Sequence, residues 1–169
     1  MTTSLFNRPL DLIYFIYFAT HIPITLLIDL QSFYPPHIVP QILKDVIAIL
    51  VNDFKDPLMG SKEPLYWFLS FIYCELFFQL IFFFFACYGL WKNSLHIRLG
   101  LVAYGAHVAT TVLPTLAEVY FNPTFNLTTS ERLTLISFYF PYLLLPLIML
   151  FDSYLRVSSA LKTVHLKQE

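Results

Sequence analysis

Four runs of apolar residues, each close to the length needed to cross a lipid bilayer, constrain this chain more than any other feature. They cover residues 10–30, 66–90, 99–116 and 133–151. A helix of roughly 20 apolar residues crosses the hydrocarbon core, and in lipid only helices or closed barrels satisfy their own backbone groups. The sequence therefore predicts an all-α membrane protein, in which four transmembrane helices form one bundle and a single domain over residues 1–169.

The composition agrees with a membrane protein and excludes a nucleic-acid-binding one. Charged residues make up only 12% of the chain, whereas a soluble domain carries about 25%. The net charge of −1 leaves no basic field that would attract nucleic acid. Arg8 precedes the first apolar run, but no small-residue cleavage site follows it, so we interpret the run as an uncleaved span.

A long connection between the first two runs, residues 31–65, carries an amphipathic segment. Its apolar residues recur at three-four spacing: Ile42, Leu43, Val46, Ile47, Leu50 and Val51. This spacing predicts a short helix that lies on the membrane or caps the bundle.

The distribution of lysine and arginine predicts the orientation of the bundle. With four spans, the N-terminal tail, the second loop and the C-terminal tail lie on one side of the membrane. These segments hold Arg8, Lys92, Arg98, Arg156, Lys162 and Lys167. The other side holds Lys44, Lys55, Lys62 and Arg132, spread over a longer length and offset by acidic residues. By the positive-inside rule both termini are expected in the cytosol.

Polar side chains inside the apolar runs are spaced to lie on one face of each helix. They are His21, Thr25 and Asp29 in the first run, Glu75 and Gln79 in the second, His107, Thr110 and Thr111 in the third, and Tyr139 and Tyr142 in the fourth. At 1.5 Å per residue they reach similar depths, between the bilayer centre and the non-cytosolic side. Because ionisable groups in a span are costly, we favour a functional role for Glu75 and Asp29 over a structural one. The two histidines are more often packing residues.

Several other sites are not expected. No cluster of cysteine, histidine and carboxylate has the spacing of metal ligands, so we predict no metal and no cofactor. Cys74 and Cys87 lie at different depths of one predicted helix, which argues against a disulfide. Asn126 begins a glycosylation sequon, but its loop is short and close to the membrane, so we expect it to be unused.

Small residues and prolines mark the packing of the last two runs. Gly105 and Ala109 are four apart, which favours close approach of a second helix. Pro114, Pro141 and Pro146 each remove a helical hydrogen bond. The resulting kinks have two equally favoured roles: they open a pocket, or they only adjust helix packing.

Several motifs in the same order resemble one known family. They are His21-Ile-Pro-Ile-Thr25 with Ile28-Asp29-Leu-Gln31, Asp53-Phe-Lys-Asp56-Pro57-Leu, Cys74-Glu75-Leu-Phe-Phe-Gln79, and Glu131-Arg-Leu-Thr-Leu135 with Tyr139-Phe-Pro-Tyr142. Together they resemble the sigma-2 receptor family of the EXPERA superfamily, whose relatives include the emopamil-binding protein, a sterol isomerase. The resemblance extends from about Tyr14 to Leu150.

The resemblance implies a multi-pass protein of the endoplasmic reticulum, with the amphipathic helix in its first lumenal loop and a pocket reached from the membrane. By the same resemblance, Asp29 pairs with ligand amines and Glu75 hydrogen-bonds to Asp29. Asp56, Gln79, Thr110 and Tyr142 match other pocket positions, and His21 completes the set of expected ligand-binding residues. The C-terminus departs from the family because residues 165–169 form a poor dilysine retrieval signal.

Three functions follow as alternatives. The first is a receptor-like protein that binds sterols and lipophilic cationic amines and acts in sterol and lipid homeostasis. The second is a sterol double-bond isomerase in which Glu75 and Asp29 exchange protons with the substrate. The third is an adaptor for client proteins such as mitochondrial precursors. Expected partners are the sterol or amine ligand and membrane lipids, whereas a homodimer and a membrane-protein partner in sterol transport are left open.

Overall fold

The computed structural model describes residues 4–61 and 63–165, and helices dominate it. In chain order these are α1 (Pro9–Ile24), α2 (Gln41–Asn52), α3 (Tyr66–Cys74), α4 (Leu80–Trp91), α5 (His96–Phe121), α6 (Thr129–Tyr139) and α7 (Pro141–His165). Short 3₁₀ turns cover Leu5–Asn7, Gln31–Phe33 and Pro123–Phe125. Lys62 and residues 166–169, which hold most of the C-terminal retrieval sequence, lie outside the described part of the chain.

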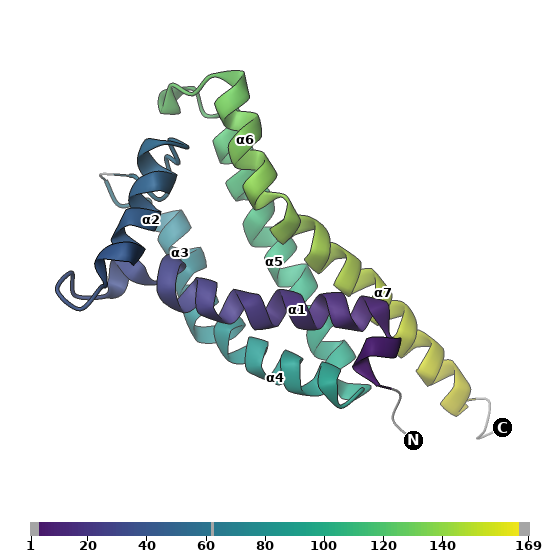
Figure 1. Ribbon diagram of the computed structural model, residues 1–169. Coiled ribbons are helices and arrows are strands. Elements are labelled where there is room, and N and C mark those ends of the chain that lie inside the picture. The colour runs from purple at the N-terminus through teal and green to yellow at the C-terminus, as the bar shows by residue number, and fades with distance from the viewer. Residues whose placement is uncertain (1–3, 62, 166–169) are drawn as a thin grey trace.

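Four continuous helical stretches are long and apolar enough to cross a membrane: Pro9–Asp29, Tyr66–Trp91, His96–Phe121 and Thr129–Thr163. Each matches one of the apolar runs in the sequence, the first ending one residue earlier than expected, so the prediction of an all-α protein with four spans is confirmed. The fourth stretch is longer than expected because α6 and α7 join directly at Phe140, before Pro141. The start of α1 and the end of α7 lie at the same end of the bundle, opposite the turn between α5 and α6 (Figure 1).

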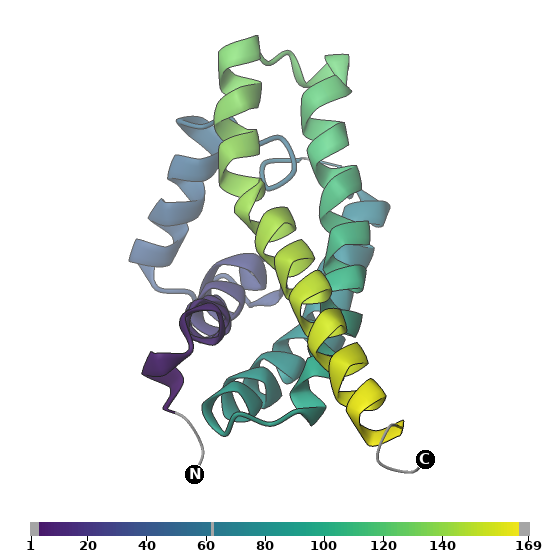
Figure 2. The ribbon, with the colours of Figure 1, turned by 90° about the vertical axis from the view of Figure 1, so that its right-hand side faces the viewer.

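The four spans form two pairs. In the first pair α1 packs along α4, and in the second pair α5 packs along the fourth span, which consists of α6 and α7. A contact between α4 and α5 joins the two pairs. Figure 2 shows α5 and α7 crossing beside each other, with α1 nearly end-on. Gly105 permits the close crossing, since a Cβ atom there would lie 2.4 Å from the carbonyl oxygen of Pro146. This finding agrees with the small-residue face expected around Gly105.

The amphipathic segment forms a helix, α2, as its periodicity predicts. Leu43, Ile47 and Leu50 are half-buried against the bundle, while Ile42 and Ile49 are exposed. α2 contacts the π-helical turn that ends the first span. The helix therefore caps one end of the bundle and leaves a second apolar stripe uncovered, which suits a position at the membrane surface.

Two of the spans contain a π-helical turn, which their sequences do not predict. The first is Thr25–Asp29 after α1, and the second is Glu75–Gln79 between α3 and α4. Pro23 lies two residues before the first turn, but the hydrogen bond that it cannot donate would run back to Ala19, on the other side of Pro23 from the turn. Neither turn therefore has a local cause in the sequence. Such turns occur often at functional sites.

Candidate intramembrane binding site

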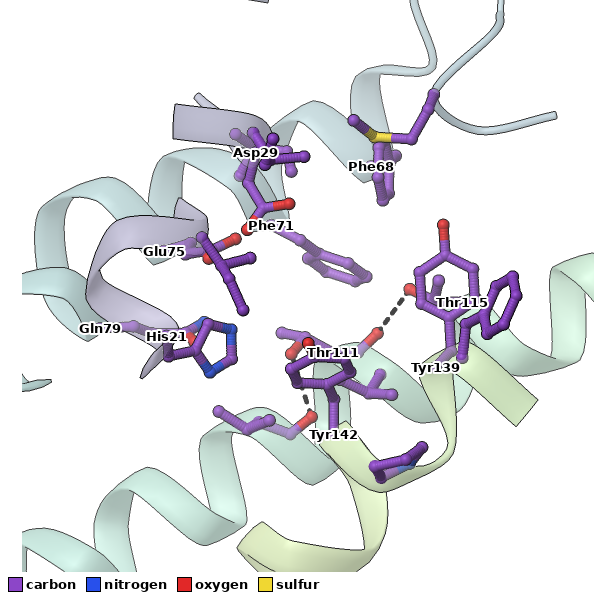
Figure 3. Close-up of a pocket in the computed structure, with 18 of the residues that line it drawn as sticks. His21, Asp29, Phe68, Phe71, Glu75, Gln79, Thr111, Thr115, Tyr139 and Tyr142 are labelled. Carbon is purple, nitrogen blue, oxygen red and sulfur yellow. Dashed lines mark hydrogen bonds between the residues drawn. The ribbon is translucent and has the colours of Figure 1, made fainter. Parts of the chain in front are cut away.

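A cavity of about 700 Å³ lies between the two helix pairs. Its walls come from all four spans and from α2, and most of the lining side chains are apolar or aromatic. A volume of this size suits a drug-sized or sterol-sized molecule. Figure 3 shows polar groups gathered at two places on this wall, one around Asp29 and Glu75 and the other around Tyr139.

The first polar place is a pair of carboxyl groups, one on each π-helical turn. Asp29 ends the first turn and Glu75 begins the second, and both side chains line the cavity. One carboxyl oxygen of Asp29 and one of Glu75 lie within 4.8 Å of each other. Thr25 donates a hydrogen bond of 2.6 Å from Oγ1 to Oε1 of Glu75.

His21 lies beside the carboxyl pair, with its ring held among aromatic side chains. The ring stacks on Phe83 at a centroid distance of 5.0 Å, and Tyr17 and Tyr142 contact it at 5.0 and 4.9 Å. Ligand atoms of His21, Asp29 and Glu75 all lie within 4.8 Å of one another. The fold brings these groups together from two spans, a proximity that their spacing along the chain does not reveal.

The second polar place is built on Asp56, which follows α2. Oδ1 of Asp56 accepts hydrogen bonds from the backbone N–H groups of Leu58 and Met59, at 2.9 and 3.1 Å. Tyr139 donates from its hydroxyl to Oδ2 at 2.5 Å. Both oxygens of Asp56 are thus engaged in holding the loop against α6. The Phe54 and Phe138 rings, 4.9 Å apart, reinforce the same contact.

Six of the seven expected ligand-binding residues line the cavity: His21, Asp29, Asp56, Glu75, Gln79 and Tyr142. Thr110 does not line it. Its side chain is exposed on the outside of α5, and its hydroxyl donates to the carbonyl of His107 at 2.7 Å in the same helix. Thr111 and Thr115 face the cavity instead. Successive side chains of a helix point about 100° apart. Thr110 and Thr111 therefore face different sides of α5, although they are adjacent in the sequence.

Several other residues of the wall were not expected from the sequence. Tyr17 and Tyr104, whose hydroxyl groups are 2.9 Å apart, lie between α1 and α5. Ser137 brings α6 into the site together with Tyr139. Spacing predicted that Tyr139 shares a helical face with Tyr142, but its bond to Asp56 depends on the tertiary fold.

A buried ionic network closes the end of the bundle that carries both termini. Asp11 is fully buried and binds Arg98 at 2.6 Å, Arg156 at 3.3 Å and Arg8. Arg8 also donates to the carbonyl of Leu90 at 2.8 Å. These bonds tie α1 to α4, α5 and α7. The sequence analysis used the three arginines only for orientation, because their common partner appears only in the folded chain.

These features define an integral membrane protein of four helices, with a cavity of ligand size and a carboxyl pair in its wall. Residues 42–153 match the family model of EXPERA, the expanded EBP superfamily. The chain belongs to this family, and the family resemblance in its motifs is confirmed.

Known relatives agree with this assignment over most of their length. The chain is 45% identical to sigma intracellular receptor 2 of Xenopus tropicalis over 150 residues, which cover 85% of this chain and 86% of the relative. It is 41% identical to the Homo sapiens protein of the same name, over 80% of this chain and 81% of the relative. Efficient mitochondria targeting-associated protein 19 of Schizosaccharomyces pombe is 28% identical, over 85% and 74% respectively.

Proposed function

We propose that the protein is a receptor-like protein that binds sterols and lipophilic cationic amines in the intramembrane cavity. The observation that carries this proposal is the close pair of Asp29 and Glu75, with carboxyl oxygens within 4.8 Å of each other, in the wall of an apolar cavity of about 700 Å³. The similarity to proteins named sigma intracellular receptor 2 supports a receptor-like role. Its place is the membrane of the endoplasmic reticulum, with both termini cytosolic, and its role lies in sterol and lipid homeostasis.

The carboxyl pair explains how the site recognises a cationic amine. Two negative charges at this separation in a low-dielectric site oppose double ionisation, so the pair retains one proton and one negative charge. We assign the proton to Glu75 and the charge to Asp29. An ammonium ligand then meets one net negative charge and forms an electrically neutral complex.

The remaining wall suits the hydrophobic body of the ligand. Phe68, Phe71 and Tyr142 present aromatic surface to the cavity. Aromatic rings bury a large apolar area and attract a nearby cation through their faces. A neutral sterol uses the same apolar volume, and its hydroxyl group needs only a hydrogen bond from the polar wall. The site therefore accepts both ligand classes by different polar contacts.

An isomerase is the second candidate, and the same pair of carboxyl groups favours it. A protonated and an ionised carboxyl beside an apolar cavity supply an acid and a base for moving a sterol double bond. A third candidate, the handling of client proteins, draws only on the name of the S. pombe relative.

One experiment separates the three functions. Purified protein is incubated with a sterol that carries an isomerisable double bond, and both binding and product are measured. We expect saturable binding of one sterol per chain, displaced by a lipophilic amine, without turnover. Turnover supports the isomerase, and the absence of both binding and turnover contradicts the receptor-like function.

A further inference from the structure

We propose that His21, Asp29 and Glu75 form a binding site for a divalent transition-metal ion, with Zn²⁺ as the best match. This site goes beyond the proposed binding of sterols and amines, although it uses the same carboxyl pair. Three observations carry it: the convergence of the three ligand groups, the unsatisfied histidine nitrogen and the balance of charge.

The geometry is close to that of a zinc site. The three ligand atoms lie within 4.8 Å of one another. A tetrahedral zinc with bonds of about 2.1 Å holds its ligand atoms about 3.4 Å apart. Rotation of the carboxyl groups that shortens these separations by about 1.4 Å would therefore bring all three atoms onto one ion. A fourth position would face the open cavity, where water or a ligand group can occupy it.

His21 has a buried nitrogen that the protein does not satisfy. Among the described residues, Nδ1 of His21 is buried and has no hydrogen-bond partner. Buried polar atoms without a partner are rare and call for an explanation. The ring is already oriented by stacking on Phe83 and by edge contacts with Tyr17. A neutral imidazole held in this way is a common ligand for zinc, and a bound ion would give the buried nitrogen of His21 a partner.

The charges also match a divalent ion. Metal binding releases the proton that the pair holds without metal, and the two ionised carboxyl groups then neutralise one Zn²⁺, so the complex carries no net charge into the low-dielectric interior. The hydroxyl of Thr25 holds Glu75 by a bond of 2.6 Å, as outer hydrogen bonds commonly orient metal-binding carboxylates. An ammonium ion and a divalent metal ion would compete, because each uses Asp29. Metal binding would therefore exclude cationic ligands from the cavity.

The test begins with the wild-type protein, purified with a chelator and free of organic ligand. Titration calorimetry with zinc chloride should give one Zn²⁺ per chain. X-ray absorption of the loaded protein should show nitrogen and oxygen ligands at about 2.0–2.2 Å. A shell of sulfur at about 2.3 Å would assign the metal to the cysteines and overturn the proposal, as would the absence of stoichiometric binding.

Variants then test the individual ligands. His21→Gln and Asp29→Asn should each lower zinc affinity at least about tenfold, whereas His96→Gln, at an exposed histidine outside the cavity, should not change it. If His21→Gln and Asp29→Asn bind zinc as tightly as His96→Gln, the proposed metal site is contradicted. Amine binding is measured separately in the chelated protein, so a failure of the metal site leaves the proposed receptor function standing, and the reverse also holds.

Discussion

At the scale of single residues, Tyr142 is an aromatic residue of the cavity wall beside His21, which in turn lies next to the carboxyl pair. Its ring lines the cavity and packs against His21 and Tyr17, at 4.9 and 6.2 Å. We expect Tyr142→Ala to weaken ligand binding by about 1–3 kcal/mol, the usual loss for a buried aromatic contact. Equilibrium binding of a lipophilic amine measures the loss. Tyr154→Ala, at an exposed position of the same helix, is the control, and equal affinities in both variants would assign Tyr142 to packing alone.

Thr110 and Thr111 form a natural pair for testing which face of α5 meets the ligand. Thr111→Phe adds a large ring to the cavity wall, whereas Thr110→Phe adds the same ring to the outside of the helix. We expect the first variant to lose at least about tenfold in affinity, equivalent to 1.4 kcal/mol, and the second to bind normally. The opposite result would restore Thr110, the residue carried over from the family, to the site.

Single residues also show what the sequence can and cannot reveal about this site. Asp29 and Glu75 could be singled out because acids are rare within apolar spans. Thr110 was expected in the cavity wall but lies outside it. Periodicity shows which residues share a helical face, but not which face meets the neighbouring helices. The partners of Asp56 and Asp11 were likewise hidden, since Tyr139 and Arg98 are more than 80 residues away along the chain.

At the scale of helices, the crossing of α5 and α7 depends on one glycine. A Cβ at Gly105 would meet the backbone oxygen of Pro146 at 2.4 Å and the Cβ of Leu150 at 2.8 Å. Gly105→Ala should therefore force the helices apart and destabilise the protein by about 1–3 kcal/mol, the typical cost of overpacking. Thermal unfolding in detergent measures this effect.

Gly100→Ala provides the matched control on the same helix. A Cβ at Gly100 would meet the ring of Phe82 at 2.6 Å, which is the far end of a side chain that can rotate away. Its effect should be clearly smaller than that of Gly105→Ala. Equal losses of stability would mean that the close crossing is not what constrains residue 105.

Helix positions followed from the sequence, but their irregularities did not. Apolar run length predicted the four spans, and three-four spacing predicted α2, because both patterns are local. The π-helical turns at Thr25–Asp29 and Glu75–Gln79 lie where the two spans meet and are joined by the hydrogen bond from Thr25 to Glu75. Neither turn has a local cause in the sequence. Since these turns carry Asp29 and Glu75, the geometry of the site required the folded structure.

At the scale of the whole molecule, both termini lie at the end closed by the Asp11 network (Figure 1). The lysine and arginine distribution predicts that this end faces the cytosol. Tags at each terminus should be digested when protease is added to sealed microsomes, while a marker protein inside the vesicles survives. Protection of either tag would contradict the predicted orientation.

The central claim is that Asp29 pairs with the charge of an amine ligand, and two affinities measured on Asp29→Asn test it most directly. Loss of the ionised carboxyl leaves the ammonium desolvated and unpaired, which should weaken amine binding by about 2–5 kcal/mol. A neutral sterol needs no charged partner and should bind Asp29→Asn nearly as well as wild type. Glu75→Gln keeps a donor and should have a smaller effect on the amine. Intact amine binding in Asp29→Asn, or an equal loss for amine and sterol, would contradict the ion pair and leave Asp29 as a structural acid at the end of the first span.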